Sequence, residues 1–176
     1  GLARQTAEAA MQIRHEANVQ RVEDGVNQLR QAQLDITTWA RNLRGKSALD
    51  PKDFGGQDGQ SLDQVAQAKF QDAAQKIAGQ CSNDDQRRFF AQSQARLRLE
   101  LEGHIQDHVE HQTLVSAQDT YVATMAKETQ NIAANGVRVD GSLDANTISQ
   151  GLARAKFAAQ AKAKVLGMDQ AAAEME

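Results

Sequence analysis

A heptad pattern of apolar residues is the feature that most constrains the fold of this chain. The pattern alternates steps of three and four over more than three repeats, with Gln33 in one place, and its apolar members are Val19, Val22, Val26, Leu29, Ile36, Ala40 and Leu43. This spacing turns one stripe of a helix toward a partner helix, as in coiled coils. We therefore predict a long helix over about residues 2–44, ended by Gly45.

A second heptad register runs without a break from Phe90 to Ile132. Its members between these two are Gln94, Leu97, Leu101, His104, His108, His111, Val115, Gln118, Val122, Met125 and Thr129. The preceding "SNDDQ" at residues 82–86 is a capping pattern that places acids at the positive end of a helix. The sequence therefore predicts one helix over about residues 84–135.

Two shorter helices and one linker complete the prediction. A capping box, "SLDQ", begins a helix expected over residues 61–79. Another helix is expected over residues 145–166, where Gly167 ends a stripe made of Ile148, Leu152, Ala155, Ala159 and Leu166. Residues 45–59 contain the only proline, Pro51, and four of the twelve glycines, which is typical of a linker.

The fold class that follows is all-α. Aromatic residues make up only 4% of the 176 residues, and alanine and glutamine dominate, so helix is favoured almost everywhere. We expect a single module, an elongated helical bundle with coiled-coil-like packing, built from two long and two shorter helices. The long helices extend beyond the ends of the short ones. Their apolar stripes near Val19 and Val122 therefore need partners from other subunits or from other parts of the protein.

One set of residues is assigned to packing within the bundle or between subunits. This seam consists of Val22, Val26, Leu29, Ile36, Leu97, Leu101, His104, His108, His111, Val115, Val122, Met125 and Ile132. The chain begins with Gly1 and ends in "GMDQAAAEME", a helix stop followed at once by a helix start. We therefore expect it to be a fragment of a longer protein. It contains no signal-peptide pattern and no apolar run approaching the ~20 residues of a membrane span.

The cluster "HIQDHVEH" holds three of the four histidines at helical spacing. One metal ion cannot take all three from one helix, because His104 and His111 are separated by roughly 10 Å of helical rise. His104 and His108 remain weak metal candidates that would need ligands from a second helix. The favoured interpretation is polar layers in the packing seam, and a pH-responsive packing site is the alternative.

Basic side chains follow one another in the last predicted helix without an intervening acid. Arg154, Lys156, Lys162 and Lys164 form a candidate contact for a polyanion, either nucleic acid or an anionic membrane surface. The net charge of −3 argues against a general nucleic-acid binder. A solvated helix face is the favoured interpretation of these four residues.

Patterns that indicate catalysis are missing from the sequence. It has no glycine-rich phosphate loop, no HExxH and no nucleophile elbow, and the single cysteine, Cys81, has no histidine near it in sequence. We therefore expect no enzymatic activity, no catalytic residues and no cofactor.

The order of segments resembles a known group of proteins. A long helix ending in "LRGKSALD", a glycine-rich loop, a short helix, and "NDDQRRFFAQSQARLRLELEGHIQDHVEHQ" running into "DTYVATMAKETQNIAANG" look like helical structural proteins of tailed bacteriophages. The resemblance covers about residues 20–170, and its landmarks are "RG..ALD" and "D.QRR.F". It implies a virion protein, internal, ejected or tail-associated, made in the bacterial cytoplasm. The partners it implies are copies of the chain and other virion proteins.

Two other classes of protein fit part of the pattern. A four-helix or coiled-coil sensor module of a transmembrane receptor shares the long helices and heptads, but membrane spans would flank it. The tail "GMDQAAAEME" begins another polar helix, which favours the virion interpretation. A zinc-dependent protein using His104 and His108 would retain metal tightly and lose stability with a chelator.

Overall fold

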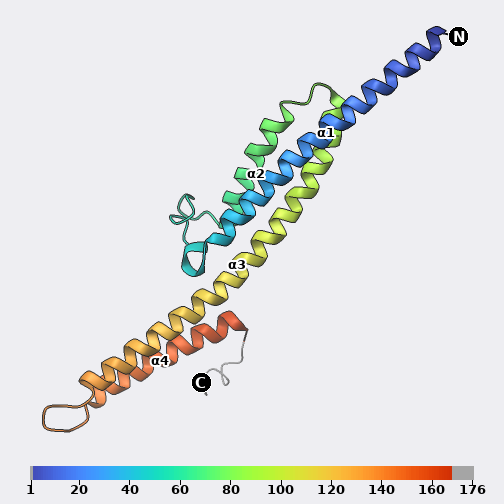
Figure 1. Ribbon diagram of the computed structural model, residues 1–176. Coiled ribbons are helices and arrows are strands. Elements are labelled where there is room, and N and C mark those ends of the chain that lie inside the picture. The colour runs from blue at the N-terminus through green and yellow to red at the C-terminus, as the bar shows by residue number, and fades with distance from the viewer. Residues whose placement is uncertain (1, 168–176) are drawn as a thin grey trace. The chain divides into compact units, whose positions relative to one another are not determined.

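The chain folds into four α-helices and one short 3-10 helix. The computed structural model describes residues 2–167, with side chains from residue 4 onward. Its elements are α1 (Leu2–Asn42), η1 (Gly45–Ala48), α2 (Leu62–Ala78), α3 (Asp84–Asn135) and α4 (Ala145–Leu166) (Figure 1). An isolated bridge between Val137 and Leu143 is the only β-type pairing among the described residues. The all-α prediction is confirmed.

Helix ends follow the capping residues that the sequence predicted. Ser61 and Gln64 form a complete capping box at the start of α2. Gly167 ends α4 in the left-handed conformation, with φ of 65°. Only the end of α1 differs, because the helix stops at Asn42 and Gly45, with φ of 53°, turns the chain into η1 within the predicted linker.

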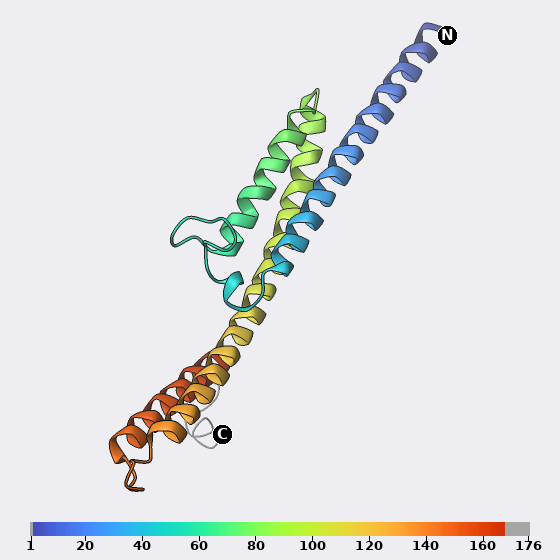
Figure 2. The same cartoon turned by 60° about the vertical axis from the view of Figure 1, so that its left-hand side comes forward.

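Residues 1–109 form the first compact unit, which we call unit 1. It contains α1, α2 and the first part of α3, and α2 lies alongside both (Figures 1 and 2). Its core consists of Leu29, Ile36, Ala40, Ala48, Phe54, Leu62, Ala66, Phe70, Ala74, Ile77, Phe90, Leu97, Leu101 and Ile105. Of the predicted seam, Leu29, Ile36, Leu97 and Leu101 are therefore buried, and Val26 packs against the core.

Polar contacts fix how the helices of unit 1 are aligned. Gln33, only 6% exposed, donates its side-chain amide to the Leu97 carbonyl at 2.9 Å. This contact accounts for the polar residue inside the predicted stripe. Asn18 of α1 accepts hydrogen bonds from Asn83 at 3.0 Å and from Gln86 at 2.7 Å, which ties the start of α3 to α1.

The buried line along α3 departs from the predicted register after Leu101. The next core position is Ile105, which is 1% exposed, whereas His104 and His111 are exposed and Gln112 is buried. A straight α-helix has 3.6 residues per turn and drifts about 20° per heptad from a strict seven-residue repeat. Ile105 and Gln112 are consequently buried one position after His104 and His111, while His108 and Val109 are both half-buried.

The first turns of α1 are uncovered. All described side chains from residue 4 to residue 17 are exposed, including Met11 at 72% and Ile13 at 67%. Val19, at 43%, is also exposed, as expected for the end of the stripe, and Val22 is half-buried.

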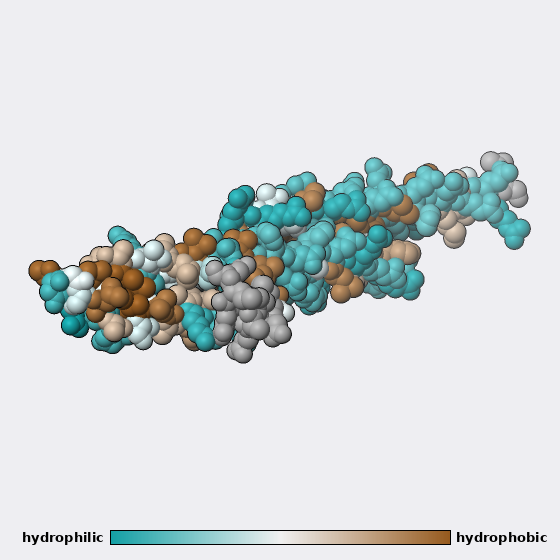
Figure 3. Space-filling model, turned by 90° about the horizontal axis from the view of Figure 1, so that it is seen from below, coloured by the Kyte–Doolittle hydropathy of each residue, from teal (hydrophilic) through white to brown (hydrophobic). Residues whose placement is uncertain are grey.

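Residues 110–176 form the second compact unit, unit 2. Its described part is a helical hairpin of the last part of α3 and α4. Within residues 110–167 the buried residues are Gln112, Glu128, Gly136, Gly151 and Ala163, so no large apolar side chain is buried there. Figure 3 shows hydrophobic surface over the end of the hairpin that carries the turn.

We predict that truncating Ile105 destabilises unit 1 and that truncating His104 does not. Ile105→Ala should cost about 2–5 kcal/mol of the free energy of unfolding because it removes a buried side chain. His104→Ala should change it by less than about 0.5 kcal/mol. Urea unfolding followed by the fluorescence of the single tryptophan, Trp39, measures both variants. Equal losses would contradict the corrected register.

Candidate functional site: the α3–α4 hairpin

The turn between α3 and α4 is closed by backbone hydrogen bonds. The Arg138 amide donates to the Ser142 carbonyl at 2.8 Å, and the Gly141 amide donates to the Arg138 carbonyl at 2.9 Å. Gly141 has φ of 84°, a left-handed conformation that strongly favours glycine. The turn is therefore a defined β-turn that sets the position of the residues at its tip.

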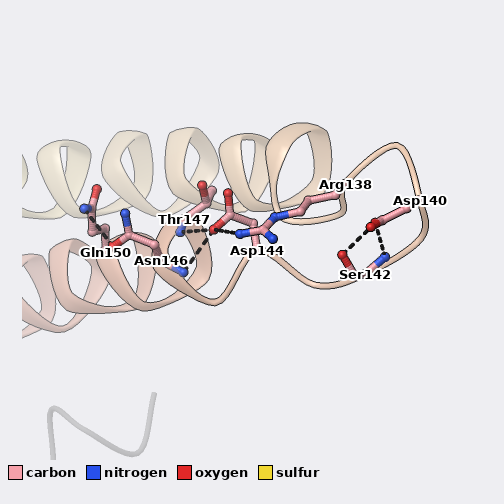
Figure 4. Close-up of polar contacts among 7 residues, drawn as sticks. All are labelled: Arg138, Asp140, Ser142, Asp144, Asn146, Thr147 and Gln150. Atoms are coloured by element: carbon pink, nitrogen blue, oxygen red, sulfur yellow. Dashed lines mark hydrogen bonds and ion pairs between the residues drawn. The ribbon is translucent and has the colours of Figure 1, made fainter.

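Two aspartates stabilise this turn (Figure 4). Asp140 accepts hydrogen bonds from the Ser142 hydroxyl at 2.6 Å and the Ser142 amide at 2.9 Å, and these bonds lower the pKa of Asp140. Asp144 caps α4 by accepting from the amides of Thr147 and Asn146, and the bond from Thr147 is the main cause of its lowered pKa. Arg138 lies 3.8 Å from the Asp144 carboxylate. Both acids thus hold the loop in shape.

A bidentate ion pair joins the two helices of the hairpin. Arg154 donates from Nε to Glu128 Oε1 at 2.8 Å and from Nη2 to Glu128 Oε2 at 2.9 Å. The Glu128 side chain is only 6% exposed, so its charge depends on this partner. The pair lowers the pKa of Glu128 and raises that of Arg154.

Glycine at position 151 lets α4 approach α3 closely beside this pair. A Cβ atom at Gly151 would lie 2.9 Å from Cγ1 and Cδ1 of Ile132 and 3.5 Å from Glu128 Oε2. The 2.9 Å separations are too short for ordinary contact, so the Ile132 side chain or the helices would have to shift. The ion pair and the glycine together determine how the two helices align.

Exposed apolar side chains distinguish the surface of the hairpin. Val139, at the tip of the turn, is fully exposed. The other large exposed ones are Leu114, Val122, Val137, Leu143, Leu152, Phe157, Val165 and Leu166. Such a surface is typical of a site that binds another macromolecule through apolar contact.

The predicted histidine cluster does not come together in unit 1. His104 is exposed, and His108 is half-buried with Nε2 2.9 Å from the Leu43 carbonyl oxygen. Among the described residues, no three His, Cys, Asp or Glu side chains lie close enough to hold a metal ion. His108 therefore contacts the end of α1.

The predicted basic stripe divides between two roles. Arg154 pairs with Glu128, and the Lys162 ammonium lies 4.5 Å from the centre of the Tyr121 ring. These two residues hold α4 against α3. Lys156 and Lys164 are exposed, and a contact with a polyanion stays a prediction for them.

Unit 1 carries a smaller candidate surface. A groove between α1 and the start of α3 is lined by His15, Asn18, Val19, Val22, Glu23, Asp85, Gln86, Phe89, Gln92 and Ser93. Phe89 is 50% exposed there, and Glu23 and Asp85 make its rim acidic. The groove is a second place where apolar side chains, Val19 and Phe89, are exposed.

Similarity to known proteins does not inform the interpretation of this chain. No family model, no curated protein and no solved structure matches the chain. None of the helices over the described residues is both long enough and apolar enough to cross a membrane. The residues themselves therefore carry the functional interpretation.

Sequence reasoning missed the ion pair and the glycine contact. Glu128 and Arg154 lie 26 residues apart across a turn, and each resembles an ordinary surface charge on its own helix. The sequence did contain a signal. Once the turn is placed at residues 136–144, α4 runs back along α3 and brings Arg154 opposite Glu128. The hairpin geometry was needed to pair the two charges.

We predict that two glycine substitutions have opposite effects. Gly103→Ala should stabilise α3 by up to about 1 kcal/mol, because alanine is the better helix former and a Cβ there meets nothing within 4 Å. Gly151→Ala should instead destabilise the hairpin, because its Cβ meets Ile132. Thermal unfolding measures the effect of Gly103→Ala, and hydrogen exchange over residues 120–160 measures that of Gly151→Ala. A stabilising Gly151→Ala would show that the close approach is unimportant.

The Glu128–Arg154 pair should make the hairpin acid-sensitive. Because the folded pKa of Glu128 lies below its ordinary value of 4.5, the pair stabilises the fold above that pH, and the contribution is lost as pH falls through the folded pKa. Arg154→Gln leaves the Glu128 charge without this partner. Protonation of Glu128 at low pH removes that charge and should therefore restore part of the stability that the variant has lost. The difference in thermal midpoint between the two proteins should therefore shrink from about pH 7 to about pH 3. A constant difference would contradict a role for the charge.

Proposed function

We propose that the chain is a non-enzymatic assembly module, a structural component of a bacteriophage particle. The observation that carries the proposal is apolar surface on both units that the described chain leaves uncovered. In unit 1 it follows the exposed first turns of α1 and the groove at Phe89. In unit 2 it follows the hairpin and its tip. Helices with uncovered apolar faces are expected to pack against other subunits.

The phage assignment rests on the resemblance over residues 20–170, and the surfaces support an assembly role of that kind. The partners we propose are copies of the same chain and other virion proteins. The tip at Val139 is suited to a neighbouring protein in such an assembly, because a closed turn presents an aliphatic side chain at little entropic cost.

Location in purified particles tests this proposal. An antibody raised against the chain would be used to probe phage particles banded on a density gradient and membranes from the same culture. We expect signal in the banded particles. Signal confined to the membranes would contradict the proposal and favour a sensor module of a transmembrane receptor.

A further inference from the structure

A half-buried carboxyl group of unit 1 has an oxygen atom that no donor satisfies. Asp63 lies in the first turn of α2, and its Oδ1 is buried without a hydrogen-bond partner among the described residues. One turn further along α2, the side-chain nitrogen of Gln67 is also buried without a partner there. Buried polar atoms are nearly always paired, so these two need a physical explanation.

The cation nearest to this carboxyl group is engaged elsewhere. Arg98 of α3 donates from Nε to the side-chain oxygen of Gln67 at 3.1 Å. None of the ion pairs of the described chain joins Arg98 to Asp63. The bond to Arg98 directs the oxygen of the Gln67 amide toward α3 and leaves its nitrogen unpaired. Asp63 therefore lacks the close compensation that a buried carboxylate needs.

The other charged group that acts on Asp63 is a second acid, Glu102 of α3, which is also half-buried. Burial is the main cause of the raised pKa of Asp63, and the charge of Glu102 raises it further. Gln67 and Arg98 act in the opposite direction and are weaker. Both leading causes disfavour the charged form of Asp63.

We propose that Asp63 is a proton-dependent contact between α2 and α3. As a neutral acid it donates its hydroxyl hydrogen to the Glu102 carboxylate, and as a carboxylate it repels Glu102. One proton taken from solvent thus replaces a repulsion with a hydrogen bond, because a protonated carboxyl group has a donor and a carboxylate has none. The positive end of α2 favours the charge on Asp63, and burial and Glu102 outweigh it.

The sign of this contact is opposite to that of the ion pair in unit 2. Because the folded pKa of Asp63 is raised, its contribution to stability is present at low pH and is lost as pH rises through that pKa. The contribution of Glu128 is instead lost as pH falls. Acid therefore strengthens a contact of unit 1 while it weakens the hairpin. This inference does not depend on the virion assignment.

Urea unfolding of the purified chain at several pH values tests the proposal, with the fluorescence of Trp39 as the signal. Asp63→Asn keeps the size of the side chain and removes its charge at every pH. The urea midpoint of the variant relative to the wild type should rise between about pH 3 and about pH 7, because only the wild type acquires the unfavourable charge. A difference that is constant, or that falls as pH rises, would overturn the proposal.

Two further substitutions identify the partner and control for surface charge. In a Glu102→Gln background the pH-dependent effect of Asp63→Asn should shrink, because the like charge is gone; an unchanged effect would reject Glu102 as the partner. Asp72 is an exposed acid on the same helix. Asp72→Asn should show no pH-dependent difference from the wild type, and an effect equal to that of Asp63→Asn would overturn the proposal. Circular dichroism verifies that each variant remains helical.

Discussion

A helix in water is stable mainly when another element packs on its apolar face, and the two units of this chain differ in how much apolar surface is buried. In unit 1 the apolar stripes of α1, α2 and the first part of α3 meet around Phe70 and Phe90, which are at most 1% exposed. Within the described part of unit 2 the same long helix packs against one helix, α4. The first unit therefore has a buried apolar core, whereas the described part of the second buries no large apolar side chain.

In unit 2, where few apolar side chains are buried, polar interactions align the two helices. The hairpin is aligned by a bidentate ion pair between Glu128 and Arg154, by close approach at Gly151, and by a turn whose aspartates accept hydrogen bonds from the backbone. These interactions specify geometry more than they add stability, since an ion pair of this kind offsets most of its own desolvation cost. The hairpin is thus well defined and still has exposed apolar side chains.

Much of the fold could be predicted because helix ends depend on local residues. Ser61, Asp144 and Gly167 act through contacts within a few positions, and the predicted bounds of α3 and α4 match the structure. The buried line along α3 could not be predicted beyond Leu101, because the drift of a straight helix against a heptad depends on its neighbours. Of the candidate site, the basic residues were found, but the inward contacts of Arg154 and Lys162 required the position of α3.

The central claim is that unit 1 is held by a buried apolar core, whereas the hairpin of unit 2 is held mainly by the Glu128–Arg154 pair, the close approach at Gly151 and the turn. Hydrogen exchange of the wild type and of Arg154→Gln tests it most directly, because amide protection reports local opening. The account predicts that Arg154→Gln lowers protection over residues 110–167 and leaves protection over residues 25–109 unchanged. Unchanged protection of the hairpin would contradict it.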